Sequence, residues 1–234
     1  MQLDQIYSKL PEIIPGVLAQ ISEIARCIHC FGWAEANSGN LSVNITDELI
    51  ASGLIASPDD ERYFLVSGTG TRYRQMQYDA LSCLILIRVT ALAEEMYPEN
   101  CRPTSEWISH ISLQNHFHCH KLKHKVIIHA HATEAIAFSN NPLYGSGDYL
   151  HSELFRVLPE LKFYLPEGIG MCGYYEPGST ELCDATLSCI GNKKAMIWQK
   201  HGVLGFGKTI DEAFDYLELV NKATKVWITI NSYS

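Results

Sequence analysis

Positively charged side chains are scarce in this sequence. Its 234 residues include 18 Lys and Arg against 26 Asp and Glu, which gives a net charge of −8 when histidine is neutral. Proteins that bind nucleic acid usually carry a basic stripe or patch, and this chain has none, so nucleic acid is excluded as a partner. A negative protein can still bind a phosphorylated metabolite, because backbone N–H groups and a bound metal provide local positive potential.

Long hydrophobic runs are absent as well. No apolar stretch approaches the roughly 20 residues that a helix needs to span a bilayer. The first residues, MQLDQIYSKLPEII, lack the basic-then-apolar order of a secretory signal. We therefore expect a cytoplasmic protein without a membrane partner. In that compartment the eight cysteines should be reduced and mostly buried, and the spacing of Cys27 and Cys30 reflects one face of a helix rather than a redox pair.

Linkers, low-complexity tracts and internal repeats are also missing. With 47% hydrophobic and 19% charged residues, the composition is typical of a globular protein. We predict a single domain over residues 1–234, with a helical segment at 1–31 packed on the rest.

Hydrophobic periodicity and turn residues predict alternating helices and strands. Helices are predicted over 3–31, 106–120, 133–139, 150–158, 180–190 and 209–231, and Pro11 and Pro15 should break or start the first of them. Strands are predicted over 41–45, 62–66, 83–87, 126–131, 195–198 and 203–206. Residues 47–61 are expected to form a surface loop with a turn at 58–60, and residues 90–96 leave both helix and strand open.

The stretch 125–139, KVIIHAHATEAIAFS, contains a His-x-His pair at the end of a strand of β-branched residues. Side chains at i and i+2 of a strand point to the same face, so His129 and His131 would present two imidazoles together. An isolated His-x-His is also compatible with ordinary core or surface histidines. A third histidine, His201, follows a predicted strand much later in the chain, next to Gly202.

Three histidines from two strand ends would form a catalytic type of zinc site, which keeps a coordination position open. Glu106 begins the helix predicted after Pro103, where Thr104 or Ser105 could cap it. This glutamate would be a fourth ligand or a mobile base, although a carboxylate in a first turn is also explained by the helix dipole. His116 and His120 share a helix face without a partner at metal-ligand spacing, so we interpret them as solvated residues.

Two loops of small residues follow predicted elements and could bind an anion. The first is Asn-Ser-Gly-Asn at 37–40, and the second is Ser-Gly-Thr-Gly at 67–70. Such loops can aim several backbone N–H groups at one ligand, although either could also be a connecting turn. Neither has the lysine or the glycine spacing of a nucleotide-binding loop. Beside an open metal site, the two loops suggest chemistry on a phosphorylated hydroxy-ketone.

Several short motifs, each occurring once and in a fixed order along the sequence, give the chain a resemblance to the class II aldolase/adducin family. They are GWAE with N-x-GN at 32–40, VSGTG at 66–70, PTSE at 103–106, HAHAT at 129–133, P-x-G-x-G at 166–170 and KHGV at 200–203. The family resemblance implies an α/β fold with three α/β/α layers around a mainly antiparallel sheet.

The same resemblance implies a ligand set and an assembly. One zinc ion per subunit would be held by His129, His131 and His201, in a homotetramer whose active sites lie at subunit contacts. Phosphate-binding residues implied by the matched motifs are Asn37, Gly39, Asn40, Ser67, Gly68, Thr104 and Ser105.

For the reaction, the resemblance implies reversible cleavage of a ketose 1-phosphate to dihydroxyacetone phosphate and an aldehyde, with Glu106 transferring a proton. An aldolase of this family carries a second active-site glutamate, which Glu160 matches by its spacing from the motif at 166–170.

Other activities of the family fit the same metal and loops. Two of these activities are a dehydratase of methylthioribulose 1-phosphate and a pentulose 5-phosphate 4-epimerase. A further alternative is a non-catalytic, adducin-like interaction domain. The interaction domain predicts a broken ligand set, whereas the three histidines and Glu106 are all present here.

Overall fold

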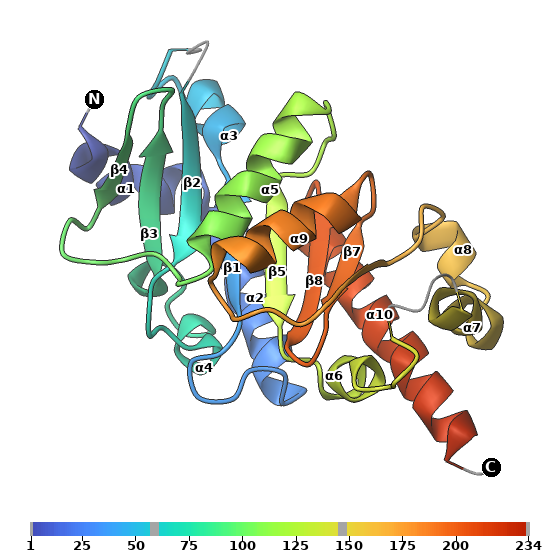
Figure 1. Ribbon diagram of the computed structural model, residues 1–234. Helices are drawn as coiled ribbons and strands as arrows, with labels where there is room; N and C mark the ends of the chain where they lie inside the picture. The colour runs from blue at the N-terminus through green and yellow to red at the C-terminus, as the bar shows by residue number, and fades with distance from the viewer. Residues whose placement is uncertain (1, 57–60, 145–148, 233–234) are drawn as a thin grey trace.

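A computed structural model describes residues 2–56, 61–144 and 149–232. In these ranges the chain forms an eight-stranded sheet in the order β4-β3-β2-β1-β5-β8-β7-β6 (Figure 1). Its strands are β1 (Asn40–Asn44), β2 (Arg62–Ser67), β3 (Leu84–Val89), β4 (Glu94–Tyr97), β5 (Val126–Ala130), β6 (Gly170–Cys172), β7 (Ala195–Trp198) and β8 (Gly202–Gly207). Neighbouring strands are antiparallel except for the parallel pair β6 and β7. The prediction of a mainly antiparallel sheet is therefore confirmed.

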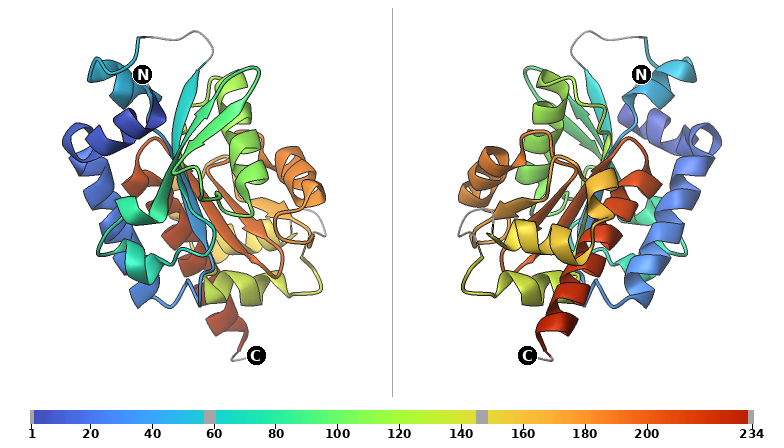
Figure 2. Two further views of the ribbon diagram at one scale, coloured as in Figure 1. Left: turned by 90° about the vertical axis from the view of Figure 1, so that its left-hand side faces the viewer. Right: turned by 90° about the vertical axis from the view of Figure 1, so that its right-hand side faces the viewer.

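Helices cover both faces of this sheet, as Figure 2 shows from the side. The front face in Figure 1 carries α5 (Trp107–Cys119) and α9 (Thr180–Ile190). On the opposite face lie α1 (Leu3–Ile13), α2 (Pro15–Cys30), α6 (Thr133–Ser139) and α10 (Ile210–Asn231). Shorter helices connect these elements: α3 (Thr46–Ala51), α4 (Tyr73–Met76), α7 (Tyr149–Val157) and α8 (Leu161–Tyr164). The three-layer α/β/α architecture is confirmed.

Alternation along the central strand β5 decides which side chains reach each layer. Val126, Ile128 and Ala130 pack into the core shared with α2 and α10. Ile127 packs into the core under α5 and α9. Because side chains at i and i+2 share a face, His129 lies on the α5 side of the sheet together with Ile127. The strand pattern thus places the first histidine under α5.

Several expectations need correction. Residues 47–61 are not a loop throughout, because α3 occupies Thr46–Ala51; the predicted turn at 58–60 lies outside the described residues. In the helical segment 3–31 the break at Pro15 is confirmed, because two helices meet at Ile14 and Pro15 starts the second one, whereas Pro11 lies inside α1 and does not break it. Residues 94–97 form the edge strand β4. All eight cysteines are free, as expected, but they are not mostly buried: only Cys83, Cys172 and Cys183 are.

Among the described residues, no single helix is long and apolar enough to cross a membrane. The pair α1 and α2 would meet that test only if taken together, and the two helices are bent by 79° relative to each other.

Candidate metal centre

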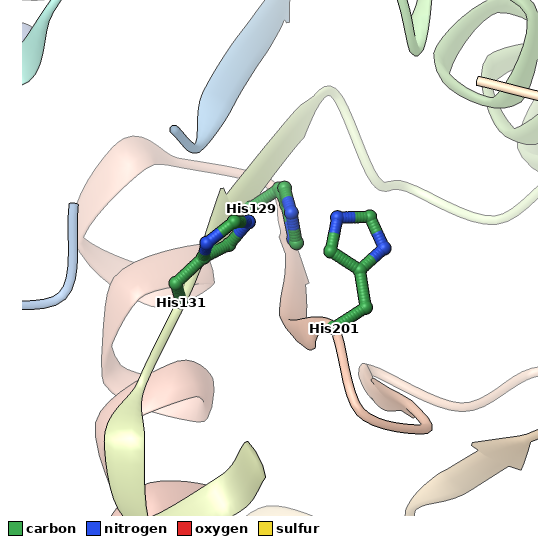
Figure 3. Close-up of side chains that lie close together, drawn as sticks. All are labelled: His129, His131 and His201. Atoms are coloured by element: carbon green, nitrogen blue, oxygen red, sulfur yellow. The ribbon is translucent and has the colours of Figure 1, made fainter. Parts of the chain in front are cut away.

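Three imidazoles converge at one end of the sheet, where β5 ends and β8 begins (Figure 3). His129 lies in β5, His131 follows that strand, and His201 lies in the tight turn between β7 and β8. Their ring centroids are 4.8 to 5.2 Å apart, and the candidate ligand nitrogens all lie within 4.8 Å of one another. The sequence prediction that these three distant residues meet is confirmed.

Gly202 allows this close approach. A Cβ atom at this position would lie 2.6 Å from the Ala130 carbonyl oxygen and 2.7 Å from Cε1 of His129. The turn before it places Lys200 in the left-handed region, with φ of 59°. A side chain at 202 would therefore displace the strand or the imidazole next to it.

Hydrogen bonds fix the orientation of two of the rings. Nδ1 of His129 lies 3.1 Å from the carbonyl oxygen of Val203, and Nδ1 of His131 lies 2.7 Å from Oε1 of Glu35. Because these oxygens only accept, each Nδ1 carries a proton, and in a neutral ring the lone pair is then on Nε2. Nε2 of His129 is buried without a hydrogen-bond partner in the described part of the chain. A bare, buried imidazole nitrogen among two other imidazoles is the donor set that Zn²⁺ and similar divalent ions prefer.

Electrostatics favour neutral, ligand-ready histidine at the centre of the group. Burial lowers the pKa of His129 well below its usual value, and the neighbouring His201 and His131 act in the same direction. Glu106 opposes this effect without overcoming it. His129 is therefore an uncharged imidazole at neutral pH, the form that binds a metal.

Glu106 faces the three histidines from the start of α5. It is 3% exposed, and its carboxylate lies 3.1 Å from Nε2 of His201 and 3.7 Å from Nε2 of His129. Burial alone would raise the pKa of Glu106, but attraction to the His129 ring in its protonated state and hydrogen bonds from His201 and Asn40 outweigh burial and lower this pKa. With His129 neutral, the hydrogen bonds are the part of this effect that remains. The carboxylate is therefore ionised and next to the position where the three imidazoles point.

The placement of Glu106 corrects one expectation. It is the N-cap residue of α5, not a residue of the first turn, and neither Thr104 nor Ser105 caps the helix. Its side chain makes no capping hydrogen bond, although carboxylates at this position often do. Helix-start chemistry therefore does not account for this glutamate, because the carboxylate turns away from its own helix and toward the histidines.

Both predicted loops line one cavity of about 240 Å³ beside these residues. Its walls are residues 37–40, 68–71, 104–106, His131, Pro177 and His201. A bridge between Gly68 and Pro103 joins the second loop to the segment that leads into α5. Gly39, with φ of 73°, leaves no room for a Cβ atom next to the His129 carbonyl oxygen. Of the predicted phosphate-binding residues, Asn37, Gly39, Asn40, Gly68, Thr104 and Ser105 are thus together.

Two other predicted site residues lie elsewhere. The Ser67 hydroxyl accepts a hydrogen bond of 2.9 Å from the backbone N–H of Leu41, and Ser67 is not among the residues that line the cavity. Glu160 is the exposed N-cap residue of α8 and lines a separate cavity of about 560 Å³ with Phe31 and Trp33. The structure does not bring Glu160 to the histidines of its own chain, and its catalytic role remains a prediction.

Some polar groups of the site were missed at the sequence level. Glu35, which orients His131, belongs to the GWAE motif, whereas His110 and Ser42 lie outside the recognised motifs. The signal was present in the spacing. Ser42 lies two positions after Asn40 in strand β1, and His110 lies four positions after Glu106, the N-cap residue of helix α5. Each pair therefore shares a face.

Comparisons with known proteins agree with this geometry. The sequence profile described as "Class II Aldolase and Adducin N-terminal domain" matches residues 19–228. The rhamnulose-1-phosphate aldolase of Bacteroides thetaiotaomicron is 29% identical over 225 residues, which cover 89% of this chain and 84% of that protein. The Listeria welshimeri enzyme of the same name is 27% identical, over 91% of this chain and 83% of its own.

Solved structures show the same fold. A sugar-phosphate aldolase from Thermotoga maritima superposes with a TM-score of 0.80 at 28% identity, covering 94% of this chain and 97% of that one. An L-fuculose-1-phosphate aldolase from Thermus thermophilus has a TM-score of 0.62 at 16% identity, over 93% and 95% of the two chains, which supports the fold alone. With its histidine triad intact, the chain belongs to the class II aldolase and adducin family, as an enzyme of the metal-dependent kind.

Proposed function

We propose that this protein is a zinc-dependent lyase of rhamnose metabolism that cleaves L-rhamnulose 1-phosphate. The products would be dihydroxyacetone phosphate and an aldehyde such as L-lactaldehyde, and the reaction would be reversible. The observation that carries the proposal is the convergence of three imidazoles and one buried carboxylate, of which His131, His201 and Glu106 line a polar cavity. The choice of sugar is supported by the rhamnulose-1-phosphate aldolases, which are similar over most of this chain.

The metal would be held by His129, His131 and His201, whose nitrogens already lie close together. A divalent ion in such a site supplies a Lewis acid that stabilises negative charge on substrate oxygens as the carbon–carbon bond breaks. The protein contributes by keeping the rings oriented, through the Val203 carbonyl behind His129 and the Glu35 carboxylate behind His131.

Glu106 would move the proton at C3 of dihydroxyacetone phosphate. The carboxylate is ionised in the resting site and its Oε1 atom lies on the side of His201. A carboxylate acting as a base must lie within hydrogen-bond reach of the proton that it removes, and Glu106 lines the cavity in which the sugar would bind.

The loops at 37–40 and 68–71, with Thr104 and Ser105, would bind the phosphate group. No described residue that lines this cavity is Lys or Arg, so the donors would be neutral N–H and hydroxyl groups. The loops are held in shape from within, since Thr69 donates its backbone N–H to the Arg102 carbonyl at 2.7 Å and its hydroxyl to the Pro103 carbonyl at 2.5 Å. A preformed loop orients the substrate through a group that does not react.

The proposed enzyme is a cytoplasmic homotetramer with its active sites at subunit contacts. Because Glu160 lies outside the cavity of its own chain, it would assist at the aldehyde end only in the cavity of a neighbouring subunit. A disruption of the tetramer should then lower activity even in subunits that keep their metal.

A screen of phosphorylated sugars with identified products tests the proposal. Purified protein is expected to contain about one zinc per subunit and to release dihydroxyacetone phosphate from rhamnulose 1-phosphate, with loss of activity in a chelator. Glu106→Gln should retain the metal and lose at least about 100-fold in kcat, because removal of a general base typically costs 10²–10⁴-fold.

Other products would identify a different activity of the family. Faster cleavage of fuculose 1-phosphate would change the substrate, whereas loss of water or an epimer would indicate a dehydratase or a 4-epimerase. The proposal fails if Glu106→Gln cleaves rhamnulose 1-phosphate as fast as the wild type, or if the protein binds no transition metal.

A further inference from the structure

A chain of hydrogen bonds reaches Glu106 from the interior of the protein. Asn40 donates from Nδ2 to Oε2 of Glu106 at 2.8 Å. Oδ1 of Asn40 lies 2.6 Å from Nε2 of His110, and Nδ1 of His110 lies 2.8 Å from the hydroxyl oxygen of Ser42. Ser42 and His110 have no exposed surface, and Asn40 is 6% exposed. This series of hydrogen bonds thus joins strand β1 to the first turns of α5, and it is shielded from solvent.

Each bond in this chain has one permitted direction. Nδ2 of Asn40 donates to Oε2 of Glu106, so the amide oxygen of Asn40 faces His110. An amide oxygen only accepts, so Nε2 of His110 carries the proton. Nδ1 of His110 is left with a lone pair, and the Ser42 hydroxyl donates to it. Burial lowers the pKa of His110 to about 4, in agreement with a neutral ring.

We propose that His110 is a positioning residue for Glu106, and that it acts by fixing the amide of Asn40. The inference rests on the proposed function in one respect, namely that Glu106 transfers the proton. With the His110 N–H in place, Asn40 can only present its nitrogen to the carboxylate. Without it, the amide is free to turn over and place its oxygen against Oε2, which would push the carboxylate out of position.

The two oxygen atoms of the Glu106 carboxylate then have different roles. Oε2 is held by Asn40, and Oε1 lies 3.1 Å from Nε2 of His201 at the open side of the site. A catalytic group needs this kind of support, because a shift of about 0.5 Å from the productive geometry already matters. Among the described residues, His110 does not line the cavity and its ring hydrogen bonds go to Asn40 and Ser42 rather than to the histidine triad, so we expect a substitution there to act through Asn40.

Three variants of His110 and one control test the inference. His110→Gln can place an amide N–H near the position of Nε2, whereas His110→Asn reaches only the position of Nδ1, and His110→Phe offers no donor. The control is Gln114→Met, one turn further along α5, because Gln114 is 2% exposed and donates to the Lys125 carbonyl without any link to Glu106. Melting temperature and zinc content are measured for all four variants.

The assay is the exchange of the C3 proton of dihydroxyacetone phosphate for solvent deuterium, since it needs no aldehyde. His110→Phe and His110→Asn should lose about 10- to 100-fold in the exchange rate at saturating substrate, on the scale of residues that orient an active-site group, with zinc content and KM near the wild-type values. His110→Gln should recover most of the rate. Gln114→Met should lose stability but keep the wild-type rate.

Two results would overturn the inference. One is a rate in His110→Gln as low as in His110→Phe, when both are folded and hold zinc. The other is an equal loss in Gln114→Met, which would show that any buried polar deletion on α5 slows the reaction. Wild-type protein that catalyses no exchange would instead refute the proposed function.

A second measurement tests the hydrogen bonds between Ser42, His110 and Asn40 even if the wild-type protein catalyses no exchange. Long-range proton–nitrogen spectra of protein labelled with ¹⁵N-histidine distinguish the two neutral tautomers, and His110→Gln identifies the signal among the ten histidines. The neutral Nε2–H form of His110 near neutral pH supports the inference. An Nδ1–H form, or a charged ring, would refute it.

Discussion

Gly202→Ala is expected to damage the metal site without touching a ligand. The new Cβ atom would lie 2.7 Å from Cε1 of His129, whereas ordinary contacts begin near 3.4 Å, so the ring or the strand must move by about 0.7 Å. That shift exceeds the tolerance of about 0.5 Å within which a site must be held. Moreover, the second contact is with the Ala130 carbonyl oxygen, which is backbone and cannot rotate away.

Competition with a chromophoric chelator measures the consequence. We expect zinc affinity to fall about 10- to 100-fold, and the free energy of unfolding of the metal-free protein to fall by about 1–3 kcal/mol. The matched control is Gly170→Ala in β6, where the Cβ atom would meet the flexible side chain of Met196 at 2.8 Å, and β6 is separated from β5 by two strands in the sheet order. Equal zinc affinity in Gly202→Ala and wild type would refute the reasoning.

Three further predictions concern groups around the site. Glu35→Gln should weaken zinc binding about tenfold and leave the fold intact, because the carboxylate that orients His131 at 2.7 Å becomes a weaker acceptor; equilibrium dialysis measures it. Ser67→Ala should lower the free energy of unfolding by about 1–3 kcal/mol in urea titration, since the buried N–H of Leu41 loses its acceptor, and a large rise in KM would show that the hydroxyl also binds phosphate. When free zinc is present at 1,000 times its Kd, its removal should lower the free energy of unfolding by about 4 kcal/mol. At 2–4 °C per kcal/mol, the melting temperature should then fall by roughly 8–16 °C, which calorimetry with and without chelator measures.

The triad was predictable because its signal is local. His129 and His131 show their common face in the strand alternation, and His201 shows its place by the glycine after it. Sheet order was not predictable in this way, since nothing in the sequence of β5 states that β1 and β8 are its neighbours. That His129 meets His201 was therefore a hypothesis, drawn from two strand ends and strengthened by the family resemblance, and the antiparallel pairing of β5 with β8 explains the meeting.

Helix α3 was missed for a different reason. Its apolar pattern covers less than two turns, with Leu49 as its buried residue, which is too short for helical periodicity to stand out from a polar loop. The break at Ile14 was visible as Pro15, but the bend between α1 and α2 depends on both helices packing into the same core as the sheet. The boundary between α1 and α2 therefore follows from the local sequence, whereas the angle between the two helices follows from tertiary packing.

Asn40 illustrates how far a motif can be read without geometry. As part of the loop at 37–40 it was assigned to phosphate, and it does line the cavity with the other loop residues. Its amide is nevertheless committed on both sides, to Glu106 through nitrogen and to His110 through oxygen. A small polar residue in a motif can thus orient the catalytic group while its neighbours in the same loop face the ligand. A side-chain amide has one donor end and one acceptor end, so the identity of its partners decides between these roles. These partners become known only when the packing of β1 against α5 is known.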